Sequence, residues 1–115
     1  MRWHDLPSVY LHRDFVDFRK SINGLAGIVE AELELPVMTG ALFVFCNKGR
    51  DKLKILYWDK TGFALWYKRL EKDKFKWPTK LTTSTMSLSE HRLNGLLSGF
   101  DIEGHHAVNY DAFNA

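Results

Sequence analysis

The sequence has few of the residues that lock a chain covalently or stiffen it. Its 115 residues include one cysteine and three prolines. Cys46 has no second cysteine with which to form a disulfide within the chain, and this is typical of a protein of a reducing cytoplasm. Because Cys46 ends the apolar run 41–46, we expect a buried small side chain rather than a catalytic thiol.

Long apolar segments are missing as well. No run approaches the roughly 20 residues that a membrane-spanning helix needs, and residues 1–5 lack the apolar segment of a signal peptide. Apolar residues nevertheless make up 45% of the chain and aromatics 14%, which favours a folded domain over disorder. We expect one soluble domain over 1–115, with its core at about 9–100 and a frayed tail at 101–115.

Signatures of catalysis are absent too. The chain shows no P-loop, dinucleotide fingerprint or Ser/His/Asp constellation. His105 and His106 are adjacent, so their side chains diverge, and we expect neither a metal site nor a cofactor. The acids that could hold magnesium in a nuclease are Asp17, Asp51, Asp59 and Glu71. Three of these fall at expected caps or turns, where Asp has an ordinary structural role, so we expect no enzyme.

The chain does have a strongly basic segment. Residues 48–80 contain eleven Lys or Arg and four Asp or Glu, a net charge of +7. The remainder contains five basic and ten acidic residues, a net charge of −5, so the overall +2 conceals a divided protein. A clustered positive field attracts polyanions, and nucleic-acid phosphates are the commonest polyanion in a cell.

Apolar alternation predicts strands at 9–11, 42–46, 53–58 and 63–70, with a possible further strand at 75–77. The links between the later strands are short, which favours antiparallel hairpins because parallel neighbours need longer crossovers. The sequence therefore predicts a mainly antiparallel meander of four to five strands.

Two helices are expected around this sheet. The first begins at an N-cap, Asp17, and stops before Pro36, with apolar residues at three- and four-residue spacing. The second begins at Ser87, which forms a capping box with Glu90, and ends near Gly99. The polar segment 80–89 is expected to be a mobile loop. We predict an α+β fold with both helices packed on one face of the sheet.

A turn with Gly62 in the left-handed conformation would pair residue 59 with residue 63. One face of the hairpin would then carry Lys54, Leu56, Trp58, Trp66 and Lys68, and the other would carry Leu53, Ile55, Tyr57, Leu65 and Tyr67. We expect phosphate contacts from Arg50, Lys52, Lys54, Lys68, Arg69 and Lys76, and base stacking on Trp58 or Trp66. The alternative is that the aromatics form the core and the lysines only solubilise the sheet edges.

An ordered series of motifs carries a family resemblance. They are GALFVF at 40–45, DKLKILYWDKTGF at 51–63, KRLE at 68–71 and FKWP at 75–78, supported by DFRKSINGL at 17–25 and by LSE and LLSG at 88–90 and 96–99. The series resembles the accessory protein, usually called TnpB, that is the second open reading frame of bacterial insertion sequences of the "sixty-six" type. Two positions depart from the family pattern: residues 48–50 read KGR where adjacent arginines are frequent, and residues 37–38 read VM in place of an aromatic-polar pair.

The resemblance implies a role in DNA transposition beside a larger transposase that carries the catalytic carboxylate triad. We expect a non-catalytic accessory protein in the bacterial cytoplasm, with transposon-end DNA or the transposase–DNA complex as its partner. A protein adaptor that docks on the transposase without touching DNA is the first alternative, and a small metal-dependent nuclease is the second. RNA in place of DNA and the oligomeric state are left open.

Overall fold

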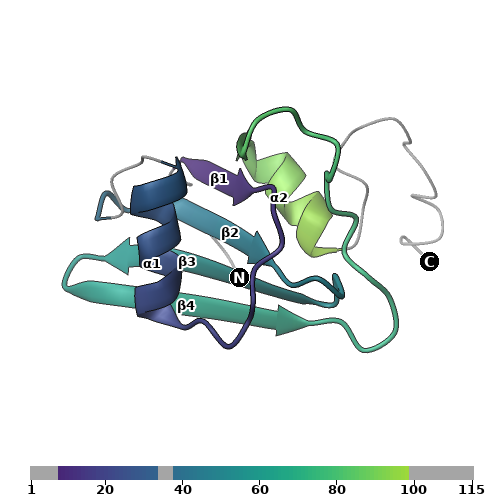
Figure 1. The fold of residues 1–115 in the computed structure, drawn as a ribbon, viewed down its shortest axis with the longest axis horizontal. Helices are drawn as coiled ribbons and strands as arrows, with labels where there is room; N and C mark the ends of the chain where they lie inside the picture. The colour runs from purple at the N-terminus through teal and green to yellow at the C-terminus, as the bar shows by residue number, and fades with distance from the viewer. Residues whose placement is uncertain (1–7, 34–37, 99–115) are drawn as a thin grey trace.

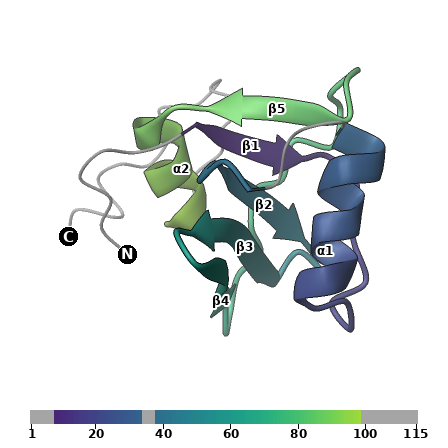
Figure 2. The ribbon, with the colours of Figure 1, turned by 90° about the vertical axis from the view of Figure 1, so that its left-hand side faces the viewer.

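The computed structural model describes residues 8–33 and 38–98 of the chain. Five strands form one sheet in the order β4-β3-β2-β1-β5 (Figures 1 and 2). The strands are β1 (Val9–His12), β2 (Leu42–Cys46), β3 (Lys52–Asp59), β4 (Gly62–Arg69) and β5 (Thr85–Leu88). Neighbours run antiparallel except β1 and β2, which are parallel. The predicted α+β class and mainly antiparallel sheet are confirmed.

The helices begin later than the sequence predicted. The helix α1 (Ile22–Ile28) has Ser21 as its N-cap and continues into the π-helical turn η1 (Val29–Leu33). Asp17 instead closes a turn before the helix, where its carboxylate accepts the Arg19 backbone N–H at 2.9 Å. The helix α2 (Glu90–Leu97) begins after Ser89, whose Oγ accepts the Arg92 backbone N–H at 3.2 Å. None of the helices in the described ranges is long and apolar enough to cross a bilayer.

The two helices cover opposite faces of the sheet, so the prediction of one shared face was wrong (Figure 2). On one face, Leu93, Leu96 and Leu97 of α2 pack in a cluster with Val44 of β2. On the other face, Leu25 and other apolar residues of α1 and η1 pack in a second cluster with the β2 residues Phe43 and Phe45. Every residue of β2 is buried because both of its faces are covered.

Two further segments differ from the prediction. Part of the expected mobile loop 80–89 is the edge strand β5, which pairs with β1 through Leu88 opposite Val9. Residues 75–77 form no strand, but Phe75 and Trp77 are 0% and 4% exposed and belong to the core beneath α2. These aromatics therefore fill the interior instead of extending the sheet.

The β3–β4 hairpin pairs one residue out of the predicted register. Asp59 lies opposite Gly62, not residue 63, and Lys60 takes the left-handed conformation (φ 54°) in place of Gly62. Ile55 consequently faces Trp66, and Lys54 faces Tyr67. Because side chains alternate along a strand, this shift sends Lys54 and Lys68 to opposite faces of the sheet.

Candidate nucleic-acid interface

Lys54, expected to contact phosphates, lies in the interior with 7% of its surface exposed. Its Nζ donates hydrogen bonds of 3.0 Å to the carbonyl oxygens of Phe18 and Lys20. The same ammonium lies 4.8 Å from the Phe18 ring centre and 5.8 Å from that of Tyr67, within cation–π range. Burial lowers the pKa of Lys54. Its position fastens the segment before α1 to the sheet.

Lys68, the expected partner of Lys54, also serves the fold. Its Nζ donates a 2.9 Å hydrogen bond to the Leu97 carbonyl at the end of α2. A cation there satisfies an otherwise unpaired helix carbonyl and complements the negative end of the helix dipole. Lys54 and Lys68 therefore hold helices on opposite faces and do not form one patch.

The tryptophans are also dispersed. Trp58 lies near the turn end of β3 and meets Phe63 edge-on, with ring centres 5.1 Å apart. Trp66 is half-buried and packs against the core on the α2 side. Six residues separate Trp58 from Lys52 along β3, which is about 20 Å of extended strand. Neither indole lies beside the cations at the start of β3.

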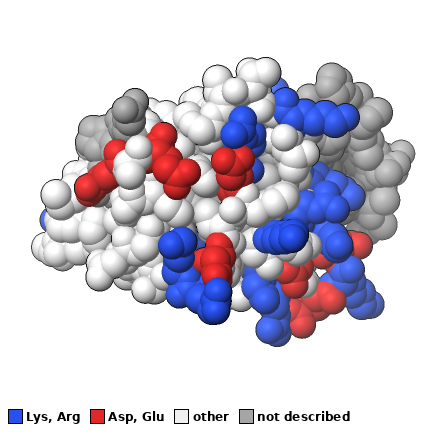
Figure 3. Space-filling model, viewed as in Figure 1, with Lys and Arg blue, Asp and Glu red and all other residues white. Residues whose placement is uncertain are grey.

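The cations that the structure brings together lie at the other end of the hairpin. Lys52 begins β3, Arg69 ends β4, and the two are directly paired. The segment after β4 folds back on the β2–β3 loop, because the Phe75 N–H donates to the Arg50 carbonyl at 2.6 Å. We call this region the basic end and define it by Lys48, Arg50, Lys52, Arg69, Lys72, Lys74 and Lys76. In Figure 3 blue side chains gather over the lower and right-hand parts of the molecule, with red ones between them.

Asn47 shapes the loop from which this end is built. Its side chain donates to Asp51 at 2.8 Å and accepts the Lys52 N–H at 3.0 Å, while its carbonyl accepts the Arg50 N–H. Arg50 adopts the left-handed conformation (φ 60°). The hydrogen bond from Asn47 is the main cause of the lowered pKa of Asp51. The loop is thus held by its own side chains, and Lys48 is exposed at its tip.

Acids reduce the positive charge of the basic end only in part. Asp51, Glu71 and Asp73 lie within it against seven cations. Arg69 is engaged by Glu71 at 2.8 Å. Within the described ranges, no ion pair is formed by Lys48, Lys52, Lys72, Lys74 or Lys76. Most of the positive charge of this end therefore remains available to an external anion.

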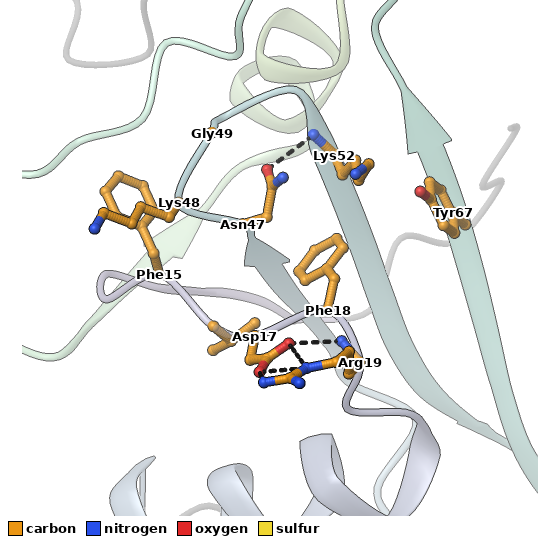
Figure 4. A pocket seen from close by; sticks show the side chains of 10 residues that line it. Phe15, Asp17, Phe18, Arg19, Asn47, Lys48, Gly49, Lys52 and Tyr67 are labelled. Carbon is orange, nitrogen blue, oxygen red and sulfur yellow. Dashed lines mark hydrogen bonds and ion pairs between the residues drawn. The ribbon is translucent and has the colours of Figure 1, made fainter.

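Beside the basic end lies an open hollow of about 900 Å³ (Figure 4). Its wall combines aromatic rings, cations and backbone from three segments: 15–19, 47–49 and the paired strands β3 and β4. Tyr67 is 50% exposed at its rim and meets Phe18 edge-on, with ring centres 6.3 Å apart. Figure 4 shows Lys48 and Lys52 on separate sides of this space.

The one acid of the hollow, Asp17, is neutralised by its neighbour. Arg19 donates to both carboxylate oxygens at 2.6–3.1 Å, and these bonds lower the pKa of Asp17 to about 2. The sequence reading missed Tyr67, Phe18 and Arg19 as candidate site residues. Their grouping depends on the true hairpin register and on the fold of segment 15–19, for which the chain carries no local signal.

The carboxylates considered for a nuclease are spread out. Asp51 precedes β3 and Asp59 ends it, eight residues later, while Asp17 and Glu71 are engaged by Arg19 and Arg69. Cys46 is completely buried as expected, and burial raises its pKa to about 12. His105 and His106 lie outside the described residues.

The fold and the site thus define the chain as a small α+β domain with a basic end and an adjoining aromatic hollow. The chain belongs to the IS66 Orf2-like protein family, whose model matches residues 7–107. Membership makes it an accessory protein of an insertion sequence, in agreement with the resemblance seen in the motifs.

Two relatives come from Sinorhizobium fredii (strain NBRC 101917 / NGR234), and both carry the description "uncharacterized protein". The protein y4jC is 36% identical over 86 residues, 75% of this chain and 73% of the relative. The protein y4hO is 33% identical over 93 residues, 81% of this chain and 80% of the relative. No solved structure matches the chain significantly.

Proposed function

We propose that the chain is a non-catalytic accessory protein of transposition that binds DNA at transposon ends, alone or within the transposase–DNA complex. The observation that carries the proposal is the basic end, where the start of β3 and two connecting segments present cations that form no ion pair among the described residues. Such cations gain from replacing the counterions condensed on a phosphate backbone.

The structure changes which residues the proposal assigns to phosphates. Lys48, Lys52 and Lys76 are candidates because they are exposed or half-exposed and unpaired within the described ranges, and Arg50 lies between them. Arg69 is a weaker candidate, because Glu71 competes with phosphate for its guanidinium. Lys54 and Lys68 drop out, since their ammonium groups are committed to backbone carbonyls.

The hollow supplies the stacking surface in place of Trp58 and Trp66. Tyr67 and Phe18 are flat rings beside Lys52, so a base that leaves a duplex could stack there while its phosphate stays at the basic end. A base inside an intact duplex is already stacked on its neighbours, so only an unpaired base can use these rings. An unpaired terminal segment is therefore the substrate class that best fits the hollow.

Electrophoretic mobility shift with the purified chain tests direct binding. Duplex, frayed-end and single-stranded DNA of one sequence are compared at low salt, with unrelated DNA alongside. We expect a shift, strongest for substrates with an unpaired end. The double variant Lys48→Gln, Lys52→Gln should lower the affinity for DNA at least tenfold. The control Lys60→Gln, Arg92→Gln removes the same number of positive charges and should leave the affinity unchanged. Absence of any shift would remove DNA as the direct partner.

A protein adaptor is the second candidate, and the acids of the basic end favour it. Glu71 and Asp73 alternate with Arg69, Lys72 and Lys74, a mixed pattern that suits a complementary protein surface as well as DNA. A pull-down tests this candidate: the immobilised chain should retain the cognate transposase after nuclease treatment. Retention without any DNA shift would replace the first proposal by this one.

A further inference from the structure

One interior side chain has an atom with no partner. His12 on β1 is 2% exposed, and its Nδ1 lies 2.9 Å from the Asp14 carbonyl oxygen. A carbonyl only accepts, so Nδ1 carries the proton and, in the neutral ring, Nε2 carries the lone pair. Among the described residues, His12 Nε2 and Thr85 Oγ1 are the buried side-chain polar atoms without a hydrogen-bond partner. Orphaned atoms of this kind call for a missing ligand or water.

The unpartnered nitrogen of His12 lies close to a carboxylate. Nε2 lies 3.9 Å from Oε1 of Glu32, which the π-helical turn η1 places over the end of β1. Asp14 is the third member, and one potential ligand atom of each residue lies within 4.8 Å of the other two. Thr85 is directly opposite His12 in the β1–β5 pair and therefore on the same face.

We propose that His12, Asp14 and Glu32 form a binding site for a divalent transition-metal cation such as Zn²⁺. Imidazole nitrogen and carboxylate oxygen are both zinc ligands at about 2.0–2.2 Å, so two ligand atoms of one ion lie about 3.4 Å apart. Glu32 needs only a small movement to meet that spacing, and its half-exposed side chain has the freedom to make it.

The surroundings of His12 match those of a metal ligand. A ligating histidine usually donates its other ring N–H to a carbonyl or carboxylate, which fixes the tautomer, and the Asp14 carbonyl does this here. Arg13 orients the Asp14 carboxylate by donating hydrogen bonds of 2.9 and 3.4 Å to its two oxygens, and each oxygen keeps a further lone pair for the ion. With three protein ligands, a fourth position remains for water, to which Thr85 Oγ1 can hydrogen-bond.

A bound metal ion would link η1, which carries Glu32, to His12 on β1 and to Asp14 in the segment after β1. The site lies on the α1 face of the sheet, because the His12 ring packs against Phe45 of that core, with ring centres 5.5 Å apart. It uses none of the residues assigned to DNA, so it stands independently of the proposed function.

Calorimetric titration of the purified chain with Zn²⁺ tests the site. The titration uses a His105→Gln, His106→Gln background, which removes the adjacent histidines as a competing site. We expect one Zn²⁺ per chain and a melting temperature that rises with zinc concentration. Glu32→Gln should weaken binding at least tenfold, whereas Glu30→Gln, an exposed neighbour on the same turn, should leave it unchanged.

Co²⁺ provides a second readout that depends on ligand identity. Its visible absorption should appear on binding and be lost in His12→Gln, with circular dichroism confirming that this variant is folded. Equal zinc affinity in the Glu30→Gln and Glu32→Gln variants would overturn the proposal. So would the absence of stoichiometric binding at millimolar Zn²⁺.

Discussion

Lys52 and Lys54 lie two residues apart on β3 and face the same side of the sheet, yet their environments differ completely. Lys52 lines an open hollow and forms no ion pair among the described residues. Lys54 is buried and donates to two carbonyl oxygens. The difference arises because the Phe18 ring and the carbonyls of Phe18 and Lys20 contact Lys54, whereas Lys52, two residues nearer the open end of the hairpin, lines the hollow.

The contrast extends to the whole hairpin. Lys54 and Lys68 lie one or two residues inside its open end and act as structural donors, with backbone carbonyls as partners on opposite faces of the sheet. The open end itself presents lysine and arginine to solvent from four converging segments. A count of positive charges along the sequence does not distinguish the lysines that bind carbonyls from the exposed cations of the basic end. Only the exposed group can contribute the counterion release that drives phosphate binding.

The largest loss of stability is expected at the buried lysine of the hairpin, Lys54. Lys54→Ala removes a buried stem and leaves the Phe18 and Lys20 carbonyls without their donor. We expect a loss of about 2–4 kcal/mol in the free energy of unfolding, measured by urea denaturation. Lys52→Ala, two residues away, should change it by less than about 0.5 kcal/mol. Equal effects at the two positions would contradict the contrast.

The next largest effect is a loss of DNA affinity at Tyr67, which tests whether the hollow binds a base. Tyr67→Ala should weaken binding of single-stranded DNA by about 1–3 kcal/mol because a stacking surface is lost. Tyr67→Phe keeps the ring and should bind as the unmodified chain does. Fluorescence anisotropy with labelled oligonucleotides measures both. Matching losses in the two variants would assign the effect to the hydroxyl group rather than to stacking.

A smaller effect is expected at the end of α2. Lys68→Met keeps the length of the side chain but removes the donor to the Leu97 carbonyl. We expect a loss of about 1 kcal/mol in the free energy of unfolding. Lys72→Met, an exposed neighbour after the strand, is the control and should be nearly neutral. A neutral Lys68→Met would show that this hydrogen bond has no role in stability.

The smallest effect concerns pH. The folded pKa of Asp17, about 2, lies below its ordinary value of 3.8, so its contribution to stability is present above pH 3.8 and is lost as the pH falls toward 2. Because Arg19 is the main cause, Arg19→Gln should return the pKa toward 3.8. NMR titration of the Asp17 carboxyl carbon measures both values. An identical midpoint in the variant would remove Arg19 as the cause.

Much of the sheet could be predicted because its signals are local. Strand β2 has the predicted bounds, and β3 and β4 differ from theirs by one residue at each end. The apolar spacing of the first helix was also correct, since Leu25, Val29 and Leu33 share one core cluster. Alternation and helical periodicity depend on neighbours in sequence, so the chain displays them directly.

The errors concern relations between distant segments. The uninterrupted apolar run of β2 indicates a strand covered on both faces, and this signal for helices on opposite sides was present but unused. The hairpin register was not fixed by the sequence, since either Lys60 or Gly62 could adopt the left-handed conformation. The one-residue difference in register decides which lysines share a face of the sheet. It therefore also decides which residues belong to the candidate site.

The salt dependence of DNA affinity in two double variants tests the central claim most directly. The exposed pair is Lys48→Gln with Lys52→Gln, and the structural pair is Lys54→Met with Lys68→Met, studied at a temperature where both are folded. We predict that the exposed pair lowers the log–log slope by about 2, while the structural pair leaves it unchanged. A slope lowered only by the structural pair would contradict the account.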